Sequence, residues 1–229
     1  MKVKFEFVAP LLGTISGNKD VATEFIVAKA AENRNLDVEE IVTIKKEELS
    51  TLPAEDIDKS STLFHRDEEG RPFLYSYMIN GFFKAACDAM IDGDGENDIF
   101  KKHTKKELKD MKLTRWSYKS TINKLIRVKE RRLYLALSGP IDVEERSMRV
   151  TTMQGDRVCL ARSESAPEGT TIELTIECLN SKLWPYIEEW LGYGIFGGLG
   201  QWRSSYFGSF TWERLDAPVK KTRTKLAVS

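Results

Sequence analysis

The residues whose types and spacing suggest chemistry most directly lie in a glycine-rich segment near the end of the chain. It reads Gly192-Tyr-Gly-Ile-Phe-Gly-Gly-Leu-Gly-Gln-Trp-Arg-Ser-Ser-Tyr-Phe-Gly208 and holds six glycines. Exposed N–H groups of such a loop can form an anion-binding nest, and Trp202 and Arg203 offer a ring for a base and a cation for a phosphate. Three glycines would let the backbone approach a nucleic acid: Gly197, Gly198 and Gly200. The alternative is a turn that is simply rich in glycine.

A second candidate region is strongly basic. Residues 101–132 carry thirteen Lys and Arg against three acids, with Trp116 and Tyr118 interleaved. Cations for phosphates and rings for bases are the components of a single-strand groove, although the same pattern also fits a solvated helical face that balances acidic residues elsewhere. The predicted phosphate contacts are Lys84, Arg149, Arg157 and Arg203, and the predicted stacking residues are Trp116 and Trp202.

Candidates for catalysis are few. Acid–base cleavage needs a group that titrates near neutrality, and His65 is one such group, in an acidic insertion. Asp20 follows the first predicted strand, where a helix N-cap explains it equally well. The sequence holds no Walker-type phosphate loop, no Gly-x-Ser-x-Gly and no carboxylate cluster for two magnesium ions. We therefore expect no catalytic residue beyond the weak candidates Asp20 and His65, and no cofactor or metal site.

Hydrophobic periodicity indicates which elements position these residues. The predicted strands are 2–8, segments between 125 and 137, the hairpin 143–152 with 157–164, 171–179 and 207–213, and the predicted helices are 20–31, 80–91 and 182–191. The order is βαββαβ, an α+β plan of the ferredoxin-like or RNA-recognition-motif type with helical and hairpin insertions. The glycine-rich segment then lies between the second helix of this core and its last strand.

Composition fits one folded domain. The chain has 229 residues, 41% of them apolar, and 35 Lys and Arg against 35 Asp and Glu, so bulk charge does not indicate nucleic acid or membrane. We expect a single domain over 1–216, with insertions at about 36–72 and 92–124, and a disordered tail over 217–229. Three separated cysteines in apolar runs, no signal peptide and no membrane span are typical of a cytoplasmic protein.

The segment Gly197-Gly-Leu-Gly-Gln-Trp-Arg-Ser-Ser-Tyr-Phe-Gly-Ser-Phe210 resembles the glycine-rich loop of the RAMP superfamily of CRISPR-associated proteins. Residues 73–87, which include Lys84, are similar to the first-helix stretch of that family, and 162–177 are similar to its hairpin-to-strand passage. The resemblance covers about half of the chain, and the two insertions fall outside the family core. The sequence also resembles uncharacterised bacteriophage proteins with the same Pro10-Leu-Leu-Gly-Thr14 opening and the same loop.

The resemblance implies a non-catalytic protein that binds single-stranded nucleic acid and assembles along it, as a homo-oligomer or as a subunit of a ribonucleoprotein complex, in a CRISPR-type system or a phage. Two alternatives stay open. One is a RAMP-like endoribonuclease acting at His65 or Asp20, and the other is a phage factor that binds a basic protein partner and no nucleic acid. RNA and DNA are both open, because the 2′-hydroxyl is recognised by details of geometry.

Overall fold

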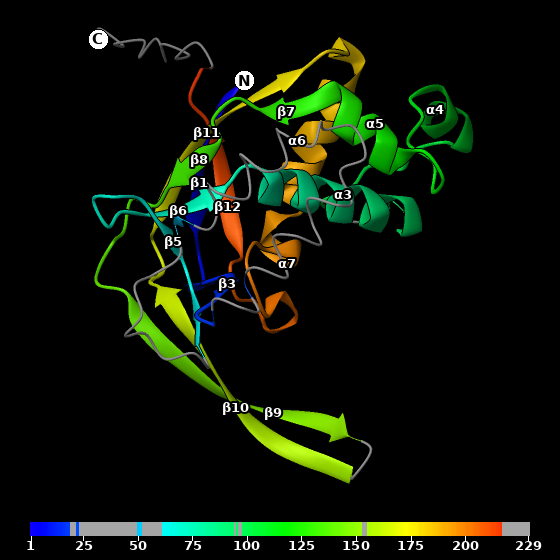
Figure 1. The fold of residues 1–229 in the computed structure, drawn as a ribbon. Helices are drawn as coiled ribbons and strands as arrows, with labels where there is room; N and C mark the ends of the chain where they lie inside the picture. Colours follow the sequence, from blue (N-terminus) through cyan, green and yellow to red (C-terminus); the bar gives the residue numbers. More distant parts are fainter. Residues whose placement is uncertain are drawn as a thin grey trace, which may run out of the picture.

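The computed structural model describes residues 1–18, 22, 50–51, 61–93, 95, 98–152 and 155–216 (Figure 1). Within this part the chain has several sheets and a few helices, which confirms the predicted α+β class. Most of the predicted helix 20–31, most of the acidic stretch 36–59 and the tail 217–229 lie outside the described residues. No helix of the described part is long and apolar enough to cross a membrane.

The main sheet has four strands in the order β12-β1-β11-β7, and each neighbouring pair is antiparallel. Its strands are β1 (Lys2–Phe7), β7 (Ile126–Val128), β11 (Thr171–Cys178) and β12 (Phe210–Arg214). The alternation in β1 buries Val3, Phe5 and Phe7 completely, as period-two patterning requires. Phe5 stacks on Phe210 of β12 with ring centroids 4.3 Å apart. These buried side chains are the contribution of β1 and β12 to the hydrophobic core.

The helices gather on one side of this sheet (Figure 1). They are α3 (Tyr77–Asp92), α4 (Lys105–Asp110), α5 (Tyr118–Leu125), α6 (Trp184–Gly192) and the single turn α7 (Gly194–Gly197), with short 3₁₀ turns η1 (Ser181–Leu183) and η2 (Arg203–Ser205). The predicted core helix 80–91 is confirmed, with its start three residues earlier. Its buried face, at spacings of three and four residues, is Ile79, Phe82, Phe83, Ala86, Cys87 and Met90.

Two further sheets flank the main one. The first joins β2 (Leu11–Leu12), β10 (Gly155–Ala166), β4 (Ser61–Leu63) and β3 (Ile15–Ser16), with β9 (Asp142–Thr152) on β10. The second joins β5 (His65–Arg66), β6 (Pro72–Tyr75) and β8 (Arg132–Tyr134). Residues 61–63 and 65–66, which we expected within a solvated insertion, are therefore strand residues, and this stretch buries Leu63, Phe64 and His65. Strands of two or three residues are too short to show a hydrophobic period.

The predicted hairpin is confirmed and is longer than expected. β9 and β10 pair from Asp142 with Ser165 to Thr152 with Gly155, and Figure 1 shows the two strands leaving the body of the molecule as a long arm. The predicted strand region 125–137 divides into β7 and β8, which belong to different sheets. Between them the Glu130 carboxylate accepts the Thr175 N–H at 2.7 Å, which fixes the point where the chain leaves the main sheet.

Candidate nucleic-acid interface

The glycine-rich segment is held by close contact with its own chain. Gly198, Gly200 and Gly208 have φ of 54°, 78° and 70°, values that favour glycine. A Cβ on Gly200 would lie 2.8 Å from the carbonyl oxygen of Leu12, and a Cβ on Gly208 would collide with the carbonyl of Leu199. The loop therefore rests directly on β2 and on itself.

This geometry places the glycines in close approach to other backbone segments of the same chain. The Pro10 carbonyl accepts the Gly208 N–H at 2.8 Å, so the two segments 10–14 and 197–208 meet in space. A Cβ on Gly197 would collide with the ring of Tyr193. The observed close approaches are to protein atoms, and a direct contact of these glycines with nucleic acid stays a prediction.

Trp202 is held at the surface by a ring and a cation. Its indole stacks on Phe207 with centroids 5.0 Å apart and planes at 12°, and the Arg146 guanidinium carbon lies 4.8 Å from the Trp202 ring. Arg146 comes from β9, and it also donates to Ser163 Oγ at 3.3 Å and to Gln201 Oε1 at 3.4 Å. Because Trp202 is still 38% exposed, part of its surface stays open to a ligand ring.

An open groove of about 670 Å³ lies beside this stack. Its lining is Ala85 of α3, Tyr193, Phe196, Gly197, Gly200, Gln201, Trp202, Arg203 and Ser204. Phe196 is 61% exposed, and Arg203 is exposed as well. The groove thus brings Gly197, Gly200, Trp202 and Arg203 of the predicted site together, with apolar rings on its walls and a cation at its rim.

The arm separates two of the predicted arginines. Arg149 pairs with Val158, and Arg157 pairs with Val150. Directly paired residues share a face and successive residues alternate, so Arg149 and Arg157 belong to opposite faces of the ladder. By the same count Arg157 shares a face with Arg146, the residue that contacts Trp202. Only Arg157 therefore lies on the loop side of the arm.

The other predicted residues are placed elsewhere. Lys84 is half-buried on α3, next to the groove residue Ala85. Trp116 is 97% exposed before α5 and does not line the groove. His65 is 2% exposed, shares a hydrogen bond of 3.0 Å between its Nδ1 and Thr51 Oγ1, and stacks on Phe73. Asp20 lies outside the described residues.

The open face of the main sheet differs from the groove in that its cations are paired with carboxylates. Lys2 pairs with Glu173 at 2.6 Å, and Lys4 pairs with Glu213 at 3.4 Å. Arg127 pairs with Glu177 at 2.7 Å on the same sheet. Each of these cations has a carboxylate neighbour, so this face offers little excess charge to a phosphate chain.

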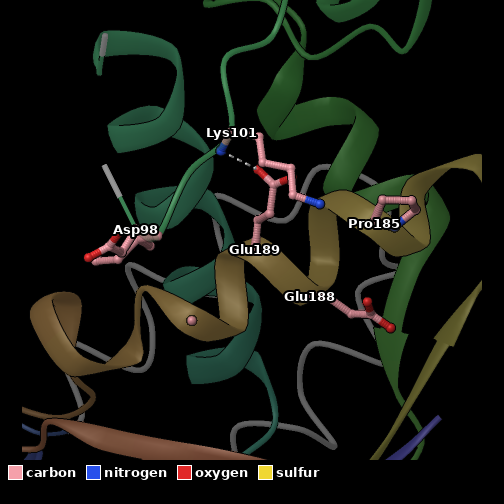
Figure 2. A pocket seen from close by; sticks show the side chains of 7 residues that line it. Asp98, Lys101, Pro185, Glu188 and Glu189 are labelled. Atoms are coloured by element: carbon pink, nitrogen blue, oxygen red, sulfur yellow. Dashed lines mark hydrogen bonds between the residues drawn. The ribbon is translucent and has the colours of Figure 1, made fainter. Parts of the chain in front are cut away.

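A second pocket, of about 320 Å³, lies between residues 98–101 and α6 (Figure 2). It contains three carboxylates, those of Asp98, Glu188 and Glu189, with Lys101 as its cation. The Glu189 carboxylate is turned toward Lys101 and accepts its backbone N–H at 3.3 Å (Figure 2), and His103 Nε2 lies 2.8 Å from the same oxygen. Its acidity makes this pocket unsuitable for a phosphate.

Four residues of the candidate interface were not predicted from the sequence: Arg146, Phe196, Gln201 and Phe207. Arg146 was one of several hairpin arginines, and the register that turns it toward the loop depends on pairing over the full arm. The glycine-rich segment, which the sequence already marked as a candidate site, contains Phe196, Gln201 and Phe207. Only the directions of their side chains could not be predicted. Irregular backbone has no period from which side-chain direction can be deduced.

No family model matches the sequence, and no curated protein matches it. Among its structural neighbours are chains of CRISPR complexes. One is from the Type III-B Cmr-beta complex bound to cognate target RNA, solved by cryo-electron microscopy, with 9% identity and a TM-score of 0.41; the match covers 93% of this chain and 59% of that chain. Another is from a Type IV-B CRISPR complex, with 10% identity, a TM-score of 0.42 and coverage of 100% and 99%.

Proposed function

We propose that this chain is a non-catalytic, single-stranded nucleic-acid-binding protein of RAMP-like fold, and that the groove beside Trp202 is its binding site. The observation that carries the proposal is the set of aromatic side chains next to cations: Trp202 stacked on Phe207, Arg146 over the indole, and Arg203 in the lining of an open groove. Stacking platforms beside cations are the means by which proteins bind single strands with little sequence preference.

The strand order supports the finer fold. In chain order the central elements are β1, α3, β7, β11, α6 and β12, a βαββαβ series. In space the fourth strand of this series lies beside the first, followed by the third and the second. This arrangement fits a ferredoxin-like core within a single domain over 1–216. The arm and the segments about 36–72 and 92–124 are then additions to it.

The site is best tested by fluorescence anisotropy with labelled single-stranded RNA and DNA across a salt series, with a duplex control. We expect single strands to bind, and affinity to fall with salt as phosphate contacts release counterions. Arg203→Ala should weaken binding, whereas the matched variant Arg127→Ala, on the ion-paired sheet, should not. If no strand binds at low salt, or if both variants behave alike, the groove is not the site.

Assembly along the strand is part of the proposal and has its own measurement. Mass photometry or analytical ultracentrifugation on strands of increasing length should show a stepwise rise in the number of protein copies. A constant one-to-one complex on every length would contradict assembly, while leaving the binding site intact. The proposal covers a subunit of a CRISPR-type complex and a phage protein that coats nucleic acid.

Two alternatives give different results. An endoribonuclease would shorten the labelled RNA, and His65→Ala or Asp20→Ala would abolish the cleavage. His65 is buried and held by Thr51, and it does not line the groove, so we expect intact RNA. A factor that binds only a protein partner would leave every strand unbound at low salt.

A further inference from the structure

Trp116 is the most exposed large apolar side chain of the described residues, at 97%, and the backbone that carries it is well braced. Lys112 has φ of 55°, and its carbonyl accepts the hydroxyls of Ser117 at 2.8 Å and Thr121 at 2.9 Å. Leu113 is fully buried between these points. We call residues 111–119 the α4–α5 corner. Its fold holds Trp116 in solvent.

Positive charge is concentrated in the corner and in helix α4 just before it. Residues 105–119 carry six cations and two acids. One of the acids, Glu107, accepts the backbone N–H of Thr104 at 2.7 Å and its hydroxyl at 2.9 Å in a capping box. The lysines of this stretch are all exposed: Lys105, Lys106, Lys109, Lys112 and Lys119. The immediate neighbours of the indole along the chain are therefore polar and basic.

The corner and the groove lie at different points along α3. Arg115 pairs with Asp92, the last residue of α3, whereas Ala85 near its middle lines the groove. Seven residues of helix correspond to about 10 Å. Figure 1 likewise shows α4 and α5 near one end of α3 and α7 well away from them. One nucleotide cannot occupy both places, but a longer strand can.

We propose that the α4–α5 corner is a second contact for the strand that occupies the groove, with Trp116 stacking on a base and the surrounding lysines holding phosphates. This inference rests on the proposed function. The chemistry favours nucleic acid over a protein partner, because the centre of a protein interface is apolar and depleted of charge, whereas Trp116 lies among lysines. A ring framed by cations is the pattern of single-strand binding.

The experiment compares two oligomer lengths, about 4 and about 16 nucleotides, which span the site sizes known for single-strand-binding folds. Trp116→Ala should weaken binding of the long oligomer by about 5-fold to 150-fold, the effect of losing one stacked base. It should leave the short oligomer, bound in the groove, unchanged. Leu179→Ala removes another highly exposed apolar side chain, 82% exposed, and is the control.

The charges provide an independent readout. Lys112→Gln with Lys119→Gln should lower the slope of log affinity against log salt by about 1.4 for the long oligomer, since each single-strand phosphate contact contributes about 0.7. Lys182→Gln, at an exposed lysine of η1, should not change it. The fold of each variant is checked by circular dichroism and thermal melting.

The outcomes separate the two proposals. If neither oligomer binds the native protein, the proposed function fails and this inference fails with it. If both oligomers bind and Trp116→Ala changes neither, the groove stands and the corner is not a contact. If Trp116→Ala weakens both lengths equally, the corner is not a separate contact, and the inference is overturned.

Discussion

The open face of the main sheet and the groove beside the glycine-rich loop use the same kinds of residues in different ways. On the sheet, Lys2 and Lys4 each lie against a glutamate. In the groove region, Arg146 lies over an indole, and Arg203 stands at the rim of a cavity with aromatic walls. A cation beside a carboxylate is neutralised, whereas a cation on a ring keeps its charge and still holds its position.

This difference explains how a chain of zero formal net charge can present a surface for a polyanion. Cations and carboxylates are paired on the sheet, acids predominate in the pocket around Glu189, and cations outnumber acids along the α4–α5 corner. The local balance, and not the total, decides where a phosphate chain can lie. A variant on the sheet face is therefore a natural control for a variant in the groove.

The largest expected effect is on the loop backbone. Gly208→Ala places a Cβ against the Leu199 carbonyl at a φ of 70°, and should lower the free energy of unfolding by more than the roughly 1–2 kcal/mol that left-handed backbone costs. Gly81, exposed on α3, has nothing within 4 Å of the same added atom. Gly81→Ala should stabilise the protein by about 0.5–1 kcal/mol. Chemical denaturation measures both, and equal effects would contradict the packed loop.

The next effect concerns the ring of Trp202. Trp202→Ala should weaken single-strand binding by about 1–3 kcal/mol, since it removes a stacking surface. Trp202→Phe should retain much of the affinity, because an aromatic ring is kept next to Phe207 and Arg146. Anisotropy titrations at fixed salt measure the three affinities. If the phenylalanine variant binds as weakly as the alanine variant, stacking is not the interaction that Trp202 makes.

A smaller effect distinguishes the charges of the two faces. Arg203→Gln should lower the slope of log affinity against log salt by about 0.7, as expected for one lost single-strand phosphate contact. Lys4→Gln should leave the slope unchanged, because Lys4 already lies 3.4 Å from Glu213. A salt series on both variants is sufficient. An equal drop for the two residues would mean that the sheet face also touches the strand.

The fold and the candidate site could be predicted from the sequence only where the residues belong to a long regular helix or strand. The periods of β1, α3 and β11 predicted their buried faces, and the segment between α6 and β12 was correctly located. The contact of Arg146 with Trp202 could not be predicted, because it joins residues 56 positions apart through the register of β9 on β10. His65 read as a titratable group in an acidic segment, yet it is a buried residue of β5, a strand of two residues.

The smallest effect is the difference in reaction rate among the three thiols. Cys87 lies in the core and Cys159 lies on the arm, so the rates test both regions. Burial raises the pKa of Cys87 to about 12 and also raises the pKa of the half-buried Cys178, whereas Cys159 is exposed on the arm. A maleimide at neutral pH should therefore label Cys159 first and Cys178 more slowly, and leave Cys87 unlabelled until the protein unfolds. Mass spectrometry of peptides from timed samples measures the order.

Modification of Cys159 also tests whether the arm takes part in strand binding. By the register of the ladder, Cys159 shares a face with Arg146 and Arg157, so a bulky adduct there should reduce strand affinity a few-fold, and Cys159→Ser should prevent this loss.

The buried thiol of Cys87 makes the stability of the fold depend on pH in a definite direction. Unfolded Cys87 ionises near 9.0 and the folded thiol near 12, so unfolding releases a proton above pH 9 and stability falls as pH rises further. Fast labelling of Cys87 in the native protein would contradict the buried face of α3 on which the groove is built.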